Sequence, residues 1–121
     1  MIYFDEVQTS AQKLTRFSQQ LIEDQFYTLV ADLRSPAEAK QWLSDFLTET
    51  ELNVFVKRLA IAQLLDRGKS YQDIKNQLKV SSATISSVSE LVSKPGNKLA
   101  QKKLQLDQWA EHLVNKLFSL I

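Results

Sequence analysis

The 121-residue sequence contains no cysteine, one histidine, two glycines and two prolines. The lack of cysteine excludes disulfides, cysteine-based zinc sites and a cysteine nucleophile. With His112 alone, one chain cannot build a histidine-clustered metal site or a Ser-His-Asp triad. So few glycines and prolines argue against a β-rich fold, because sandwiches and barrels need many turn residues. The sequence also lacks a phosphate-binding glycine loop and a convincing carboxylate pair, so we do not expect an enzyme.

Long hydrophobic runs and a strong excess of one charge are also missing. No apolar run approaches the roughly 20 residues of a membrane span, and the first ten residues lack the features of a signal peptide. We therefore expect a soluble, cytoplasmic protein with one domain over residues 1–121. Residues 1–47 carry 4 basic and 7 acidic side chains, residues 48–94 carry 7 and 5, and residues 95–121 carry 4 and 2. This balance permits DNA binding without requiring it.

Apolar residues recur at helical spacing, and strand-like alternation is absent, which predicts an all-α fold of about six helices. The first two helices are expected over residues 11–33, capped by Thr9 or Ser10, and residues 35–47, opened by a capping box. A second capping box, at residues 48–51, starts a central helix that ends at Gly68 in the left-handed conformation. Its apolar residues cover much of its circumference, which indicates a helix buried among several others.

Two short helices follow, and the chain ends with a helix over residues 97–121. Ser70 caps the first short helix, and Ser81 caps the second, which is expected to continue through Val92 and to end at Pro95-Gly96. Five apolar positions would form the small core of two steeply crossing helices: Ile74, Leu78, Val80, Ile85 and Val88. The pattern predicts a helix-turn-helix over residues 70–93, whose second helix enters the major groove of DNA. The alternative is a helical corner that only packs a core.

Residues 47–92 resemble the Trp repressor family and its Trp-repressor-like bacterial relatives. The resemblance lies in Leu47-Thr48-Glu49-Thr50-Glu51, in Lys57 to Gly68, and in the block from Ser70 to Ser86. It implies an intertwined homodimer. Residues 11–67 of both chains would supply the dimerisation helices, and the dimer would present two helix-turn-helix heads.

The resemblance also implies which residues face DNA. Small polar side chains would meet the groove, and lysines would supply non-specific attraction to phosphates. The predicted DNA-binding residues are Lys69, Gln72, Lys75, Lys79, Ser81, Ser82, Ala83, Thr84, Ser86 and Ser87. The recognition helix has no Arg or Lys, so specificity would depend on DNA shape, water and small side chains. Lys79 stands where this turn commonly carries glycine, at a mild backbone cost.

The resemblance implies only part of the effector pocket of the Trp repressor. Arg58 stands where the Trp repressor has the arginine that contacts the tryptophan carboxylate, and Thr48 matches the threonine opening its central helix. The Arg-Gly pair and the Ser of the recognition helix are replaced by Ser87, Val88 and Leu91. One cation binds a carboxylate less strongly than two, so we do not expect tryptophan as corepressor, and no cofactor is expected. The alternative role for Arg58 is an ion pair.

The sequence therefore predicts a homodimeric, sequence-specific DNA-binding transcriptional regulator, with repression as its mode of action. Two alternatives stay open. One is the DNA-binding module of replication initiators or transposases, which uses a similar helical pair on another scaffold. The other is a helical protein-interaction domain that has lost DNA binding, which the uncharged recognition helix favours.

Overall fold

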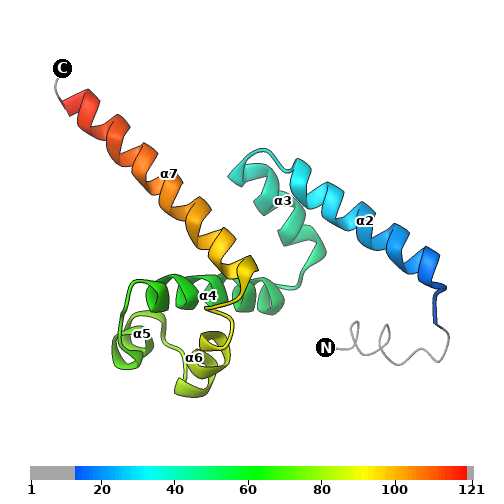
Figure 1. The fold of residues 1–121 in the computed structure, drawn as a ribbon, viewed down its shortest axis with the longest axis horizontal. Coiled ribbons are helices and arrows are strands. Elements are labelled where there is room, and N and C mark those ends of the chain that lie inside the picture. The colour runs from blue at the N-terminus through cyan, green and yellow to red at the C-terminus, as the bar shows by residue number, and fades with distance from the viewer. Residues whose placement is uncertain (1–12, 120–121) are drawn as a thin grey trace. The chain divides into compact units, whose positions relative to one another are not determined.

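The computed structural model describes residues 13–119, which contain six helices and no strand (Figure 1). The chain divides into two compact units, Met1–Phe46 and Leu47–Ile121. The helices are α2 (Arg16–Asp32), α3 (Pro36–Phe46), α4 (Glu49–Asp66), α5 (Tyr71–Leu78), α6 (Ser82–Ser89) and α7 (Pro95–Ser119). The predicted all-α fold is confirmed. Within residues 13–119, none of the helices combines the length and the apolar composition needed to cross a bilayer.

The first unit contains α2 and α3. α2 starts after Thr15, whose hydroxyl accepts a hydrogen bond from the Ser18 amide (3.1 Å), whereas the predicted caps Thr9 and Ser10 lie outside the described residues. Trp42 of α3 packs against Phe26 of α2, with ring centroids 5.9 Å apart. None of the described residues in this unit is buried. Within the described part of this unit, α2 and α3 therefore leave most of their large apolar side chains exposed.

The second unit is built on α4, whose two ends follow from local sequence. The Thr48 hydroxyl accepts from the Glu51 amide (3.1 Å), and the Glu51 carboxylate accepts from the Thr48 amide (2.8 Å), which forms the predicted capping box. After the helix, Gly68 adopts a φ of +79°, a conformation that glycine reaches without a steric penalty. Both predicted boundaries of the central helix are confirmed.

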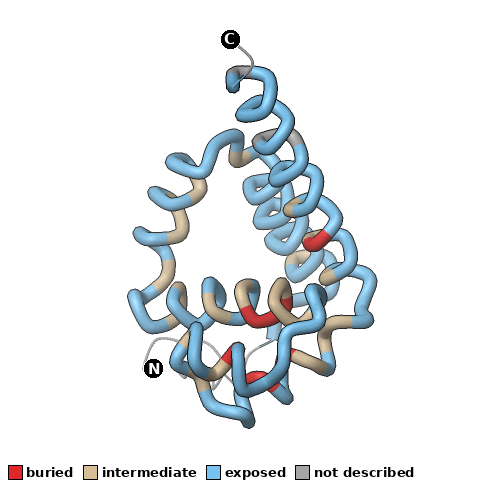
Figure 2. Tube along the Cα trace, turned by 90° about the vertical axis from the view of Figure 1, so that its left-hand side faces the viewer, coloured by how far each residue is buried: buried red, intermediate tan, exposed pale blue. Residues whose placement is uncertain are grey.

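The core of the second unit joins α4, α5 and α6, and Figure 2 shows the buried positions in red. It consists of Ile61, Ala62, Ile74, Ile85 and Val88, with Leu64, Leu65, Leu78 and Val80 packed around them. All five apolar positions predicted for the helix-turn-helix core belong to this cluster. The two short helices are therefore attached to the C-terminal half of α4.

The N-terminal half of α4 carries exposed apolar side chains. Phe55 and Val56 are 58% and 57% exposed, and Leu59 is 45% exposed. The prediction that α4 is buried among several helices includes helices of a second chain, so for this half of α4 it stays a prediction.

The boundary between α6 and α7 also differs from the prediction. α6 ends at Ser89 instead of Val92, and Pro95 begins α7 instead of ending the preceding helix. Proline is favoured at the first helical position, where its missing N–H has no helical partner to lose. The Asn97 amide side chain donates to the Val92 carbonyl (3.1 Å), which ties the start of α7 to the turn before it.

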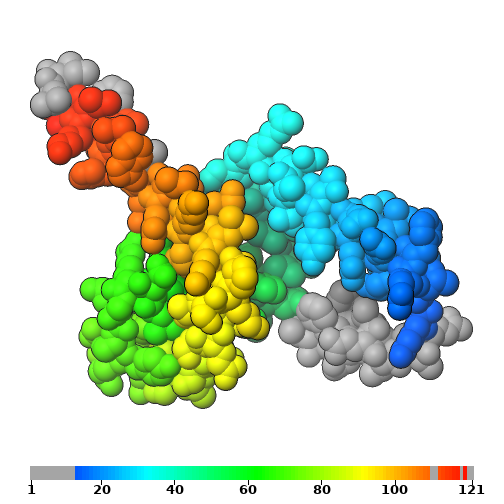
Figure 3. Space-filling model, in the orientation of Figure 1, coloured from blue at the N-terminus to red at the C-terminus, as the bar shows by residue number. Residues whose placement is uncertain are grey.

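α7 lies against α4 through its N-terminal half. Gln101 is 4% exposed and donates to the Asn97 side chain (3.2 Å). Two hydrogen bonds connect α7 to the end of α4, from Gln105 to Asp66 (3.3 Å) and from Arg67 to Gln108 (2.8 Å). The C-terminal half of α7 extends beyond α4 (Figures 1 and 3).

Candidate nucleic-acid interface

α5 and α6 form a pair of eight-residue helices joined by a tight turn. The Ser70 hydroxyl accepts from the Asp73 amide (3.2 Å) and caps α5, and the Ser81 hydroxyl accepts from the Thr84 amide (3.2 Å) and caps α6. Both caps agree with the sequence-based prediction. Because each helix is short, the caps and the shared core hold the pair in place, since helices of this length are unstable alone.

Lys79 reverses the chain between the two helices. Its φ and ψ are 56° and 50°, the left-handed conformation, and its amide donates to the Lys75 carbonyl (2.9 Å). Among residues 13–119, Lys79 is the only non-glycine residue with positive φ. The predicted backbone cost at this position is therefore present in the structure.

α6 has two faces of opposite character. Ile85 and Val88 are 0% and 1% exposed and belong to the core. The predicted DNA-binding residues of α6 are all exposed, namely Ser82, Ala83, Thr84, Ser86 and Ser87, and so is the cap Ser81. The apolar face therefore fixes the orientation of α6 and leaves a neutral face of hydroxyls and methyl groups open to a ligand.

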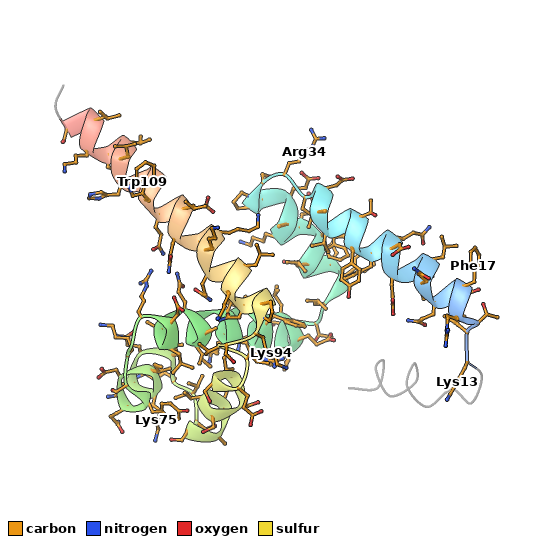
Figure 4. The ribbon with its side chains drawn as sticks, in the orientation of Figure 1. Lys13, Phe17, Arg34, Lys75, Lys94 and Trp109 are labelled. Carbon is orange, nitrogen blue, oxygen red and sulfur yellow. The ribbon has the colours of Figure 1, made fainter. Side chains whose placement is uncertain are left out.

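The predicted cationic and amide residues lie on α5 and on the segments next to it. Lys69, Gln72 and Lys79 are exposed, and Lys75, which Figure 4 labels on α5, is half-buried. The Gln72 amide donates to the Asn76 side chain (3.2 Å). These positive charges therefore flank α6 without lying on it.

The two residues of the predicted effector pocket do not meet within one chain. Thr48 caps α4, and Arg58 lies ten residues further along the helix, about 15 Å away at the helical rise. Arg58 borders two open hollows. The smaller, of about 460 Å³, lies between α4 and α6 and is also lined by Thr84 and Ser87.

The larger hollow, of about 590 Å³, contains a basic residue that the sequence-based reasoning did not select. It is lined by α4, α6 and the start of α7, and Lys94 shares it with Arg58 (Figure 4). Val88 and Leu91, the apolar replacements noted in the sequence, also line it. Lys94 lines this hollow because of the turn between α6 and α7, so no local sequence motif indicated its position.

Two capped helices, a left-handed turn between them and a common core define a helix-turn-helix protein. Residues 19–107 match the Trp repressor protein family, and the chain belongs to that family. The match confirms the resemblance and extends it from residues 47–92 to α2, α3 and the first half of α7. The family is one of DNA-binding regulators.

A relative also matches the chain. The uncharacterized protein YerC of Bacillus subtilis is 31% identical to it over 65 residues, which is 54% of this chain. The match spans 62% of the length of YerC.

Proposed function

We propose that the protein is a sequence-specific transcriptional repressor that binds DNA as a homodimer. Two helix-turn-helix heads would occupy two half-sites about one helical turn apart, roughly 34–36 Å, and the bound dimer would block a promoter. The observation that carries the proposal is the orientation of α6. Its buried Ile85 and Val88 fix the helix on the core while its exposed face carries small polar groups.

The proposed readout follows from the side chains on that face. Hydroxyls of Ser82 and Thr84 suit phosphate oxygens or either kind of base edge, and the Ala83 methyl group suits the methyl group of thymine. Lys69, Lys75 and Lys79 would attract the flanking phosphates. Because α6 has no arginine for a bidentate guanine contact, DNA shape and ordered water would supply part of the specificity.

The homodimer is proposed because one chain leaves large apolar side chains uncovered on α4 and α2. Phe55 and Val56 of α4 are more than half exposed, and Phe17 of α2 is 78% exposed. Exposed large apolar side chains, gathered on a helix in each unit, are typical of interfaces between proteins. A second copy would bury them and present two copies of α6, related by the two-fold axis, on one face of the dimer.

Selection of bound fragments from a random duplex DNA library, at near-physiological salt, tests the proposal. We expect a palindromic site with fixed half-site spacing. Low salt is avoided because phosphate attraction alone would then retain DNA without sequence preference. Recovery of no common site would contradict sequence-specific repression and favour a helix-turn-helix that binds a protein.

A charge-reversal series tests the proposed DNA-binding face directly. The double variant Lys75→Glu, Lys79→Glu should weaken binding to the selected site at least about tenfold, because two phosphate-attracting charges change sign. Lys40→Glu, on exposed α3, makes the same kind of change outside the helix-turn-helix. Affinity is measured by fluorescence anisotropy at several salt concentrations. An unchanged affinity and salt dependence in the double variant would place the DNA elsewhere.

A further inference from the structure

The exposed apolar residues of α7 repeat every seven positions. Leu99, Leu106 and Leu113 are 57%, 58% and 40% exposed, and the sequence continues the repeat at Leu120, outside the described residues. If these leucines occupy position d of a heptad, Leu117 occupies position a, Val114 position e and Trp109 position g. All six exposed large apolar residues of the described part of α7 then fall on a, d, e and g.

The contacts that α7 makes with α4 use the remaining heptad positions. Buried Gln101 and the hydrogen-bonding Gln108 occupy position f, half-buried Leu104 occupies position b, and Gln105 occupies position c. Positions b, c and f lie on the side of a helix opposite its a/d seam. α7 therefore has one face held by its own chain and an opposite leucine face that is not covered in the second unit.

We propose that this leucine face pairs with α7 of a second copy as a short parallel, two-stranded coiled coil. The inference rests on the proposed homodimer and identifies one of its contact surfaces. A seven-residue leucine repeat is the pattern that keeps two helices in contact as they supercoil. The coil is three heptads long, and the rest of the dimer would hold its two strands at high effective concentration.

Charges beside the seam distinguish the parallel arrangement from the antiparallel one. In a parallel pair, a g residue faces the e residue five positions later in the partner helix. Lys102 at g then faces Asp107 at e, and Trp109 faces Val114. An antiparallel pair would bring g residues together and set Lys102 against Lys116. The parallel pair also sets Lys103, at position a, beside its own copy. Its two Lys102–Asp107 contacts nevertheless favour parallel strands, because the antiparallel pair has only the repulsive Lys102–Lys116 contacts.

Disulfide trapping in the full-length chain tests the arrangement, because the natural sequence has no cysteine. Leu106→Cys and Leu113→Cys are made separately, and Asn115→Cys, at exposed position f, is the matched control. In a parallel, in-register coil each d residue faces its own copy at a Cα separation within roughly the 4.4–6.8 Å that a disulfide needs. We expect both d-position variants to form disulfide-linked dimers at least about tenfold faster than the control.

Sedimentation equilibrium of the natural chain separates the two proposals. A dimer whose Leu106→Cys and Leu113→Cys variants link no faster than the control would keep the proposed homodimer and overturn the coiled coil. A cross-link between Leu106→Cys and Phe17→Cys in a double variant would show instead that α2 covers the leucine face. A monomer would overturn the homodimer and the coiled coil together.

Charge exchange provides a second test that adds no cysteine. Lys102→Glu sets two acidic groups against each other, Asp107→Lys sets two basic groups against each other, and the double exchange restores the pair. Each single variant should raise the dimer dissociation constant about two- to fivefold, as expected for an exposed ion pair, and the double variant should return it to the natural value. Failure of the double exchange to restore the constant would contradict parallel pairing.

Discussion

Lys79 is the residue of the helix-turn-helix with a left-handed backbone conformation, which lowers the stability of the turn. The left-handed conformation brings the Cβ atom of an L-residue close to the following carbonyl oxygen, which costs roughly 1–2 kcal/mol. Lysine at this position keeps the conformational strain and places a positive charge beside α6. Glycine would relieve the strain but would also remove the charge. The side chain is therefore explained better by attraction to phosphate than by stability of the turn.

Substitution of Lys79 tests this balance. Lys79→Gly should raise the free energy of unfolding by about 0.5–1 kcal/mol, because the relief of strain exceeds the entropy that glycine loses on folding. Lys79→Ala removes the same charge but keeps the Cβ atom, so its stability should stay near that of the natural protein. Urea denaturation measures both. A glycine variant no more stable than the alanine variant would show that the turn is not strained.

Three residues at the end of the helix-turn-helix form the basis of a prediction about tryptophan. Ser87, Val88 and Leu91 replace the residues with which the Trp repressor holds its ligand, and Val88 is 1% exposed and part of the core. We expect millimolar L-tryptophan to leave the affinity for the selected DNA site unchanged within about twofold, because Ser87, Val88 and Leu91 supply no cation for the carboxylate. Anisotropy titrations with and without the amino acid measure the effect. A tenfold gain in affinity would show that Arg58 and Lys94 together replace the missing contact.

Among the helices, α6 depends on the residue just before it, its N-cap Ser81. The helix has eight residues and no charged side chain to favour its dipole, so the Ser81 cap supplies most of its local stabilisation. The same cap lies where a DNA phosphate would approach the free N–H groups of the helix. Stability and binding therefore depend on one side chain in different ways.

A series at Ser81 separates the two roles. Ser81→Ala should lower the free energy of unfolding by about 1 kcal/mol, because the Thr84 amide loses its acceptor. Ser81→Asn and Ser81→Asp keep an acceptor, so their stability should remain close to the natural value. Only Ser81→Asp adds a negative charge, and it should bind DNA at least about tenfold more weakly than Ser81→Asn. Equal affinities for these two variants would argue against a phosphate at the start of α6.

At the scale of the whole molecule, the protein buries little of its apolar surface within one chain. In the described residues the buried apolar core contains five side chains, whereas small domains need far more burial to be stable alone. The uncovered residues lie on α2, α4 and α7, on both compact units. We therefore expect folding and association to be coupled.

This coupling predicts a melting temperature that rises with protein concentration, because mass action favours the folded dimer. Phe55→Asp should remove the dependence by placing a charge in the proposed interface and should shift the mass in sedimentation toward the monomer. Gln77→Asp, on an exposed position of α5, makes a comparable charge change away from α4. It should retain the concentration dependence. A melting temperature that is independent of concentration in the natural protein would contradict coupled folding.

Local sequence was sufficient for most helix boundaries and for the helix-turn-helix. Thr48, Ser70 and Ser81 cap their helices through bonds to residues three positions away, and Gly68 ends α4 through its own φ. Such interactions are complete within one helical turn, so residue order specifies them. The apolar spacing of the helix-turn-helix likewise specified its core, because few arrangements of two short helices bury those five positions.

Other features required the folded chain. Pro95 begins α7 because the preceding turn places it there, Lys94 reaches the hollow beside Arg58, and Arg67 bonds to Gln108 across 41 residues. The exposure of α4 and the leucine face of α7 also became visible only when the helices were placed against one another. These properties depend on contacts between residues far apart in sequence, and periodicity shows that a face is apolar without showing what covers it.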